Sequence, residues 1–488
     1  MPLLPAGDWR PDVTDYEGQT VHDISGVIPR GDGYGPFPQF STYSSALEGP
    51  CRGSFYALKA DGSVTVFAGT ATRLYQINNT NYTWTDVSKG GVAYSGLTGS
   101  AQWRFAQFNN LVIAVQANTP PQVFDLTSSS AFADLGGSPP QAAYIDVVGR
   151  FIVLSGLLSA PYRVQWSGLN AVTTWTSGVN SSDYQDLPDG GIVRGVAGGD
   201  QSAIIFQDQA IRRMSYVPGS PIIFQIDRIA QDKGLYAPYS IIRAGETIFF
   251  YAGQGFHKIA PGGFPEQIGR EKVDRTFLAD LDKGNLQLFM GAADPKSSRV
   301  YWAYKSNNGA AGFYDKILGY DKVLDRFFPL SVTGEFLMGV SQTGLTLENL
   351  DTISASIDAM TLTLDAYATA VQPEIGQFDG ANRLGFFRGP NMEAFIESAE
   401  QGTDGQRIFV KGFRPVTDAV NVFGSLAIRE ISSAASVITP EVRKNSRTGR
   451  VDLRKAARYA RYRDRIPAGE VWSFFAGIEP DVAAEGMQ

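Results

Sequence analysis

The sequence of 488 residues is poor in the residue types that most often carry chemistry. It contains one cysteine, Cys51, and two histidines, His22 and His257. One cysteine excludes an intramolecular disulfide and a CxxC pair, and these residues together are too few for a typical structural zinc site. We therefore expect neither a metal centre nor a cofactor, and cysteine usage does not fix the redox compartment.

Charged residues are also scarce, at 19%, and acidic residues exceed basic ones by 49 to 42. The net charge of -7 excludes a globally basic coat for nucleic acid or anionic membranes, although it allows a local basic surface. No run of 18 apolar residues occurs, and no basic segment followed by an apolar one opens the chain. We expect a soluble protein without a signal peptide and without membrane insertion.

Glycine and proline, in contrast, are plentiful. The 53 Gly and 26 Pro make up about 16% of the chain, against about 12% in average usage. Hydrophobic residues at 43% and aromatic residues at 12% supply ample core material. This composition excludes disorder and collagen-like repeats as descriptions of the whole chain, and it favours short strands joined by turns.

Short runs of β-branched and aromatic residues recur along the first two thirds of the sequence, each bounded by Gly, Asn, Asp or Pro. They group into units of four strands. The first unit reads GSFYA, VTVFAG, RLYQI and WTDV. Six units are countable up to Leu330, and their second strands, which are the most apolar, recur about every 47 residues. The middles of these second strands are Val66, Ile113, Val153, Ile205, Phe249 and Tyr301.

A four-stranded unit that recurs at this spacing is typical of propeller blades. We predict an all-β chain with a β-propeller of six or seven four-stranded blades; several β-sandwiches in a row are the alternative. Closing the ring needs a last blade completed by chain from the other end or from a later segment, and Val332 to Leu350 is expected to begin a seventh blade. In the third unit, the fourth strand is expected at TWT from Thr174.

The pattern changes past about Thr361. Alternating and glycine-rich stretches there predict a second, C-terminal antiparallel β domain, either a sandwich or a barrel. The expected organisation is an N-terminal arm over residues 1–50, a propeller over 51–350, the C-terminal β domain over 351–480 and a tail over 481–488. Residues 351–366 are expected to form the crossover between the two domains.

No catalytic constellation is apparent. His257 lies on a predicted strand, where a structural role is more common than a role as a base, and no GxSxG elbow occurs. The carboxylate clusters at 183–189 and 280–282 lack the ligand pattern of a calcium loop and are expected to be solvated loops. The glycines of PRGDGYGPFP lack the spacing of a phosphate cradle. We expect no catalytic residues and no enzymatic activity.

One basic segment stands out, because ten basic residues lie between Arg443 and Arg465 against two acidic ones. In YARYRDR, the period of a strand places Tyr459, Arg461, Arg463 and Arg465 on one face and Ala460, Tyr462, Asp464 and Ile466 on the other. A ladder of guanidinium groups suits a phosphate backbone or an acidic protein surface, and it also suits an ordinary solvated sheet face. The candidate partner-binding residues are Arg458, Arg461, Arg463 and Arg465.

Several segments resemble a known family. They are WRPDVTDYEGQTVHDISGVIPRGDGYGPFP, DGSVTVFAGTATRLYQI with WTDVS, LENLDTISASIDA, LGFFRGPN, and GRVDLRKAARYARYRDRIPAGEVW. Together they resemble the tail nozzle or hub proteins of short-tailed bacteriophages, also called packaged-DNA stabilisation proteins. The resemblance covers most of the chain, and IPRGDxYGPFP and the first blade are its most specific parts.

The resemblance implies a structural virion protein that is located in the tail and assembled in the host cytoplasm. It implies a homo-oligomeric ring, a hexamer of propeller subunits below the portal and the tail adaptor, with fibre or spike proteins as further partners. Such a nozzle extends the DNA channel, retains packaged double-stranded DNA without sequence-specific binding, and lets it pass at ejection. An acidic body suits a conduit along which phosphates must slide. The alternative function is a receptor-binding tail propeller that binds or cleaves carbohydrate, and a third is a cellular scaffold.

Overall fold

The computed structural model describes residues 3–484, apart from residues 15, 17, 98, 343–371 and 404. This part of the chain is almost entirely β-structure. The one α-helix within it is α1 (Asp274–Asp280), and short 3-10 turns occur as η1 (Lys89–Gly91), η2 (Pro188–Gly190), η3 (Pro238–Ser240) and η4 (Leu286–Leu288). The predicted all-β class is confirmed.

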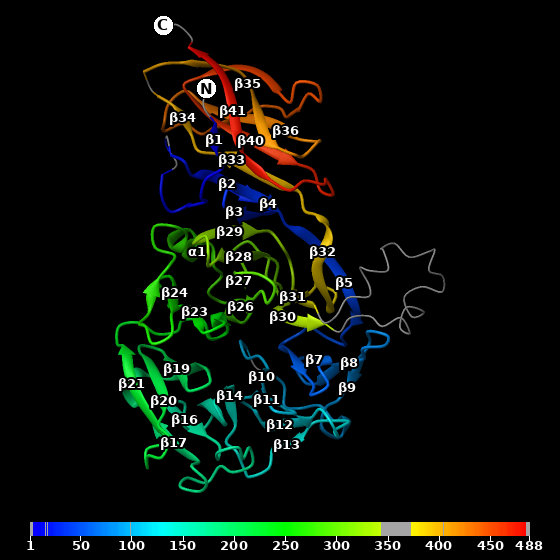
Figure 1. Cartoon of the computed structure of the whole chain (residues 1–488), viewed down its shortest axis with the longest axis vertical. Coiled ribbons are helices and arrows are strands. Elements are labelled where there is room, and N and C mark those ends of the chain that lie inside the picture. The colour runs from blue at the N-terminus through cyan, green and yellow to red at the C-terminus, as the bar shows by residue number, and fades with distance from the viewer. Residues whose placement is uncertain are drawn as a thin grey trace.

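Six antiparallel sheets of four consecutive strands follow one another along the described chain, and they form blades arranged in a ring (Figure 1). The first three blades comprise β6 (Ser54–Leu58), β7 (Val64–Gly69), β8 (Leu74–Ile77) and β9 (Trp84–Asp86); β10 (Arg104–Phe108), β11 (Leu111–Gln116), β12 (Thr119–Asp125) and β13 (Ala133–Asp134); and β14 (Ala142–Val148), β15 (Phe151–Leu157), β16 (Arg163–Trp166) and β17 (Asp183–Asp186). The next three comprise β18 (Val193–Ala197), β19 (Ser202–Gln207), β20 (Ile211–Tyr216) and β21 (Phe224–Ala230); β22 (Ile242–Ala244), β23 (Thr247–Tyr251), β24 (Phe256–Ile259) and β25 (Glu266–Gln267); and β26 (Met290–Ala293), β27 (Arg299–Tyr304), β28 (Lys316–Asp321) and β29 (Arg326–Leu330).

A seventh blade closes the ring and contains strands from distant parts of the chain. Its order is β30 (Phe336–Gln342), β31 (Gln372–Phe378), β32 (Arg383–Asn391) and β5 (Pro38–Ala46), so an N-terminal strand supplies the outer edge. In the register between β32 and β5, Phe387 lies opposite Phe40. The described chain therefore forms a propeller of seven blades, closed by chain from the other end, as ring closure required.

Each blade packs on its neighbours through interior strands. The second strands are buried over nearly their whole length, as β7 illustrates with all six residues buried, because both of their faces are covered. The first strands of neighbouring blades contact one another around most of the ring, so they are the innermost strands and surround its axis. Apolar clusters fill the spaces between blades.

The second domain is a sandwich of two antiparallel sheets built from both ends of the chain. One sheet has the order β3-β4-β41-β35-β39, with β1 beside β41; the other has the order β2-β33-β40-β36-β37, with β34 beside β40 and β38 beside β36. The N-terminal strands are β1 (Leu4–Pro5), β2 (Val21–Ser25), β3 (Val27–Arg30) and β4 (Gly33–Pro36). The others are β33 (Ala394–Ser398), β34 (Gln401–Gly402), β35 (Ile408–Thr417), β36 (Phe423–Arg429), β37 (Val437–Ile438), β38 (Val442–Arg443), β39 (Val451–Ala457), β40 (Tyr459–Ile466) and β41 (Phe475–Ala484).

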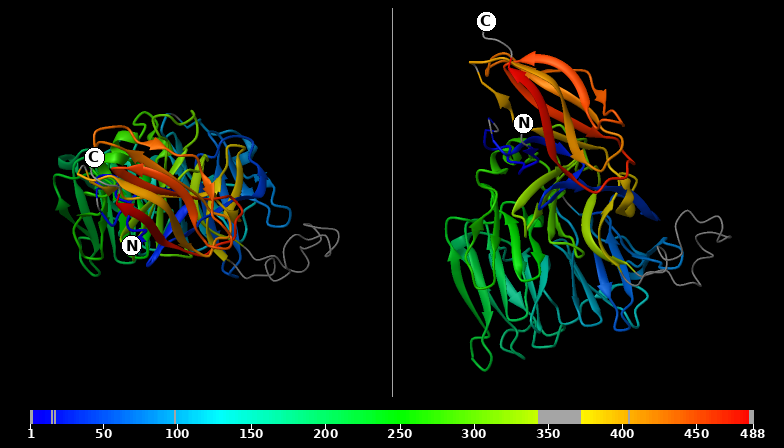
Figure 2. Two further views of the ribbon diagram at one scale, coloured as in Figure 1. Left: turned by 90° about the horizontal axis from the view of Figure 1, so that it is seen from above. Right: turned by 45° about the horizontal axis from the view of Figure 1, so that its top comes forward.

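The two sheets of the sandwich share one core. The rings of Phe413 on β35 and Tyr462 on β40 meet edge to face at 5.3 Å between centroids, and both side chains are fully buried. Figures 1 and 2 show the sandwich at one side of the propeller, next to β29 and β32. The predicted second β domain is a sandwich.

Strand pairing corrects the expected domain boundaries. Residues 1–50 do not form a separate arm, since β1 to β4 belong to the sandwich and β5 to the seventh blade. Strands β31 and β32 extend the propeller to residue 391, beyond the expected 350, and residues 481–484 continue β41 instead of beginning a tail. The expected crossover at 351–366 lies outside the described residues. These pairings join segments hundreds of residues apart, so local patterns did not reveal them.

One strand of the third blade was also misplaced. The fourth strand is β17, whereas the expected TWT segment forms a loop whose Trp175 is buried and donates from Nε1 to the carbonyl of Val172 at 2.8 Å. Trp175 therefore anchors the loop in the core between blades. The real edge strand, DYQD, is polar because its side chains face solvent.

Two polar side chains join the N-terminal segment to the propeller. Asp12 accepts the backbone N–H groups of Arg275 and Thr276, both at 2.8 Å, and so caps the first turn of α1. Arg326, at the start of β29, points into the N-terminal segment, where it forms an ion pair with Asp8. The sandwich and the ring are therefore held together through buried polar contacts as well as through apolar packing.

Candidate functional site

The predicted arginine ladder lies on β40, in the middle of one sheet of the sandwich. Ala460, Tyr462, Asp464 and Ile466 are buried toward the core, while Arg461, Arg463 and Arg465 point to the other side, as the period of two predicted. Tyr459 shares the arginine face but is itself buried. Arg458 lies in the turn before β40 and is half-buried, away from the three ladder positions.

The structure places a carboxylate beside each arginine of the ladder. Arg463 Nε lies 3.0 Å from Glu397 Oε2, and Arg461 lies 3.8 Å from the same glutamate. Arg465 pairs with Glu441 at 2.7 Å and with a second glutamate, residue 393, at 3.0 Å. Most of these glutamates come from β33 and the residues next to it, far from the basic segment in sequence.

Aromatic rings complete the ladder. The guanidinium of Arg463 lies 4.7 Å from the centre of the Phe395 ring, and that of Arg465 lies 4.7 Å from the centre of the Phe423 ring. The hydrogen bond to Glu441 raises the pKa of Arg465, and the same contact lowers the pKa of Glu441. The ladder is thus an internally compensated network, with arginine side chains only 13–27% exposed. Partner binding by Arg458, Arg461, Arg463 and Arg465 stays a prediction.

Uncompensated basic residues also lie on or beside the opposite sheet. Five exposed side chains on or beside the edge strand β39 form no ion pair with any carboxylate among the described residues: Lys411, Arg414, Arg447, Arg454 and Lys455. Arg454 has a φ of 52° at an irregularity in the pairing of β39 with β35. Period-two reasoning on YARYRDR therefore found the strand but not the free cations.

The axis of the propeller contains a cavity of about 590 Å³. Its wall includes Phe55 and Tyr56 of β6, Arg104 of β10 and Arg243 of β22, together with residues of β26 and β30. Arg243 also lines a cleft of about 360 Å³ between the fourth and fifth blades. Sequence reasoning identified none of these residues, because each arginine stands alone in its strand.

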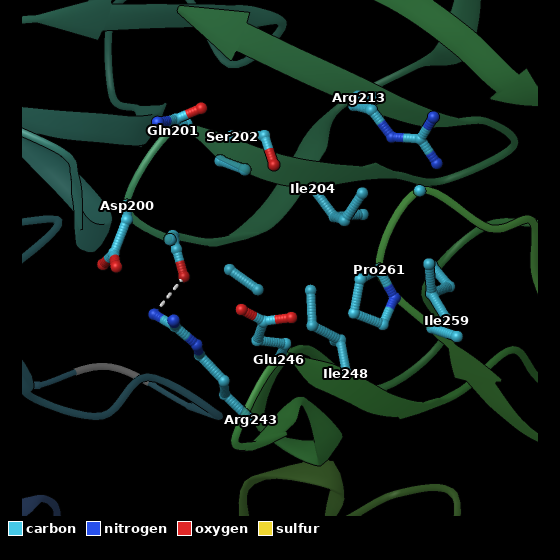
Figure 3. Close-up of a pocket in the computed structure, with 16 residues that line it drawn as sticks. Asp200, Gln201, Ser202, Ile204, Arg213, Arg243, Glu246, Ile248, Ile259 and Pro261 are labelled. Carbon is cyan, nitrogen blue, oxygen red and sulfur yellow. Dashed lines mark hydrogen bonds between the residues drawn. The ribbon is translucent and has the colours of Figure 1, made fainter.

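Figure 3 shows the lining of this cleft, in which Ile204, Ile248, Ile259 and Pro261 are apolar and the other labelled side chains are polar. Arg213 and Arg243 lie on different sides, and Asp200 and Glu246 supply carboxylates. Arg243 donates to the carbonyl of Gly198 at 2.5 Å. No ion pair joins these four charged side chains to one another within the described chain, so the cleft offers both signs of charge to a polar ligand.

The residues examined for catalysis have structural surroundings. His257 is buried, its Nδ1 lies 2.9 Å from the carbonyl of Gly255, and burial lowers its pKa. Burial likewise raises the pKa of the Cys51 thiol. The carboxylates of both acidic clusters face cations: Asp186 pairs with Arg163 at 2.6 Å, and Asp282 pairs with Lys305 at 2.8 Å.

Within residues 3–484, apart from those left undescribed, no group of three or more His, Cys, Asp and Glu side chains is arranged to hold a metal ion. No helix in the same part of the chain is long and apolar enough to cross a membrane.

Comparison with known proteins gives the following. No protein-family model matches the chain, and no curated protein matches it. Among solved structures, the extracellular domain of a one-component system from B. thetaiotaomicron is 11% identical, with a TM-score of 0.42 over 78% of this chain and 44% of that one. A chain of the Mitotic Checkpoint Complex is 9% identical, with a TM-score of 0.39 over 72% of this chain and 96% of that one.

A functionally unknown protein from Desulfotomaculum acetoxidans DSM 771 is 12% identical, with a TM-score of 0.36 over 58% of this chain and 85% of that one. This chain spans less than half the length of the first of these structures. Likenesses at this level carry no inference about what the chain does.

Proposed function

We propose that this protein is a structural component of a phage virion, one subunit of a six-membered tail nozzle. In this function it extends the DNA channel below the portal and adaptor, retains packaged double-stranded DNA and lets the DNA pass at ejection. It acts without catalysis.

The observation that carries the proposal is where the family-like segments lie. The N-terminal segment from Trp9 to Pro38 contains β2, β3 and β4, and the C-terminal segment from Gly449 to Trp472 contains β39 and β40. Segments more than 400 residues apart thus build the same sandwich and its junction with the propeller. Two resembling segments from opposite ends of the sequence therefore meet in one structural unit, while others lie in the first and seventh blades.

The way the chain is fastened also supports a mechanical function. The ring is closed by β5, the outer strand of the seventh blade, and the residues before β5 are fixed in the sandwich by pairing with β41 and β33. A ring closed by hydrogen-bonded strands resists opening, because a whole strand must detach before a blade can separate. Resistance to opening is what a channel that retains pressurised DNA requires.

Particles assembled without this protein test the proposal. They should package DNA and then lose it, measured as nuclease-sensitive DNA released from purified particles, and expression of the protein in trans should restore retention. Imaging of complete particles should place it as a six-fold ring on the tail axis. Full genome retention without the protein, or its location at the fibres or spikes, would contradict the proposal.

A carbohydrate-binding or carbohydrate-cleaving tail propeller is the second candidate, and the cleft in Figure 3 favours it. Arg213, Glu246 and Asp200 add charged hydrogen-bonding groups to a lining that also contains isoleucines and Pro261, and a mixed lining of this kind suits sugars. An array of neutral glycans and a hydrolysis assay on host polysaccharide should both be silent if the nozzle function is correct. A signal abolished by Glu246→Gln would favour the second candidate.

A further inference from the structure

The wall of the propeller axis is basic although the propeller as a whole is acidic. Residues 38–391 contain 26 basic and 30 acidic side chains. The seven innermost strands, all of them described, carry three arginines and a single carboxylate: Arg104, Arg194, Arg243 and Asp146. Basic side chains therefore outnumber acidic ones where the blades converge: Arg104, Arg243 and Lys322 line the cavity with Asp294 as the one carboxylate in its wall. A concave wall with an excess of one sign focuses its field into the cavity.

Two of these arginines are held in place without an ion pair among the described residues. Arg104 lies with its guanidinium 5.6 Å from the centre of the Tyr239 ring. Arg243 donates from Nε to the carbonyl of Gly245 at 3.0 Å and from Nη1 to that of Gly198 at 2.5 Å. These contacts orient each guanidinium, and among the described residues no carboxylate lies within ion-pair distance of either one.

The carboxylates near the cavity are already engaged. Asp146 accepts the backbone N–H groups of Val147 and Gly198, each at 2.8 Å, and burial raises its pKa, although Arg104 and Arg243 act in the opposite direction. Arg194 is neutralised by Asp208 at 2.6 Å.

Two charged residues lie toward the side of β26 and β28. Asp294 accepts from Ser297 Oγ at 2.6 Å and from the backbone N–H of Lys296 at 2.9 Å. Lys322, which is exposed, adds a third cation to the cavity wall.

We propose that the axial cavity of the propeller binds an anionic ligand that bears phosphate, sulfate or carboxylate groups, with Arg104 and Arg243 as its anion-binding pair. Lys322 contributes at the edge, and Phe55 and Tyr56 provide an apolar wall against which the rest of a ligand packs. Guanidinium groups suit this task because they offer paired donors to planar or tetrahedral anions and keep their charge at any physiological pH. The proposal concerns the propeller alone and does not rest on the nozzle function.

Isothermal titration of the full chain in low salt tests the site with three probes: sodium sulfate, a trimer of galacturonic acid and the neutral maltotriose. We expect sulfate and the acidic trimer to bind and maltotriose not to bind. A trimer that binds far more tightly than sulfate identifies an acidic glycan as the ligand, whereas equal affinities identify a simple anion; either result supports the site. Binding of maltotriose as tightly as the acidic trimer would overturn it.

Arg104→Gln and Arg243→Gln should each weaken anion binding about tenfold or more, because each removes one charge-assisted contact. The matched control is Arg447→Gln, which changes an exposed arginine of the sandwich that lines neither the axial cavity nor the cleft in Figure 3, and it should leave affinity within twofold. Anion-dependent stabilisation of the wild-type protein against heat gives a second readout that needs no variant. Absence of sulfate and trimer binding to the wild type, or equal losses in all three variants, would refute the proposal.

Discussion

We expect Arg326 to stabilise the contact between the N-terminal segment and the propeller. The substitution Arg326→Met tests this, because it removes the charge of the side chain. The side chain is 9% exposed, and its Nε lies 2.5 Å from Asp8 Oδ1. It also donates to the carbonyl of Arg30 at 2.8 Å and lies 5.2 Å from the centre of the Tyr34 ring. Methionine keeps much of the aliphatic packing but removes these polar contacts.

The size of the destabilisation depends on Asp8, the carboxylate that loses its partner. Removing one partner of a buried ion pair destabilises by about 3–5 kcal/mol. The lower end applies here, because Asp8 is one third exposed and keeps its contact with Arg10 at 2.9 Å. A loss of about 3 kcal/mol corresponds to roughly 150-fold weaker protection of the N-terminal amides against hydrogen exchange.

Hydrogen exchange measured on peptides covering residues 3–37 is the assay, since it reports this segment separately from the blades. Arg10→Met is the matched control: it removes an arginine that contacts the same Asp8 but is 41% exposed, so it should cost less than about 1 kcal/mol. Equal protection in the two variants, or a loss below about 1 kcal/mol in Arg326→Met, would refute the assignment of Arg326 as the main polar link.

Three further outcomes are expected. Burial raises the pKa of Glu335 from 4.5 to about 7, so the native state binds this proton more tightly than the unfolded chain; stability should fall as pH rises through 7, and Glu335→Gln should flatten the change in Tm between pH 5 and 8. Gly33→Ala should destabilise by about 2 kcal/mol or more, because its φ is 142° and a Cβ would lie 2.1 Å from the carbonyl oxygen of Phe475; Gly31→Ala, with open space around it, should leave Tm unchanged. Arg463→Gln should lower the free energy of unfolding by about 1–3 kcal/mol in urea titrations, because it removes the closest cation from the buried carboxylate of Glu397. Substitution of an exposed arginine, Arg447→Gln, should change the free energy of unfolding by no more than about 0.5 kcal/mol.

Six of the blades could be predicted from the sequence because each is formed by one continuous segment of the chain. Its four strands follow one another through short turns, and the apolar second strand marks each repeat, as in VTVFAG of β7. The wrong prediction at β17 has a physical cause. Outer strands of blades face solvent, so β17 has the polar sequence DYQD, whereas hydrophobicity favours the nearby aromatic TWT as a strand. Hydrophobicity indicates the interior strands of a blade well and its outermost strand poorly.

The seventh blade and the sandwich could not be predicted as completely. Strand β5 pairs with β32 over a separation of more than 300 residues, and β1 pairs with β41 over more than 450. The sequence PQFSTYSSA of β5 does not indicate which strand it pairs with, because its buried and exposed residues do not alternate. Gly33 lies in what the sequence predicts to be an N-terminal arm, yet its missing side chain is what allows β4 to approach Phe475. Long-range pairing of this kind is decided by the tertiary fold.

The basic residues of this chain occur both as a dense run near the C-terminus and as isolated arginines on the inner strands of the propeller. Arginines of the dense basic run near the C-terminus form ion pairs with glutamates from other parts of the chain. Such pairing is favourable because like charges in a row on one sheet face repel one another. The isolated Arg104 and Arg243 attract no notice in the sequence, yet the radial symmetry of a propeller brings single residues of successive inner strands to one axis. We therefore expect the dispersed Arg104 and Arg243, and not the basic run on β40, to bind an anion. The affinity difference between Arg243→Gln and Arg463→Gln for sulfate tests this directly: only the first should fall, even though Arg463 belongs to the denser cluster.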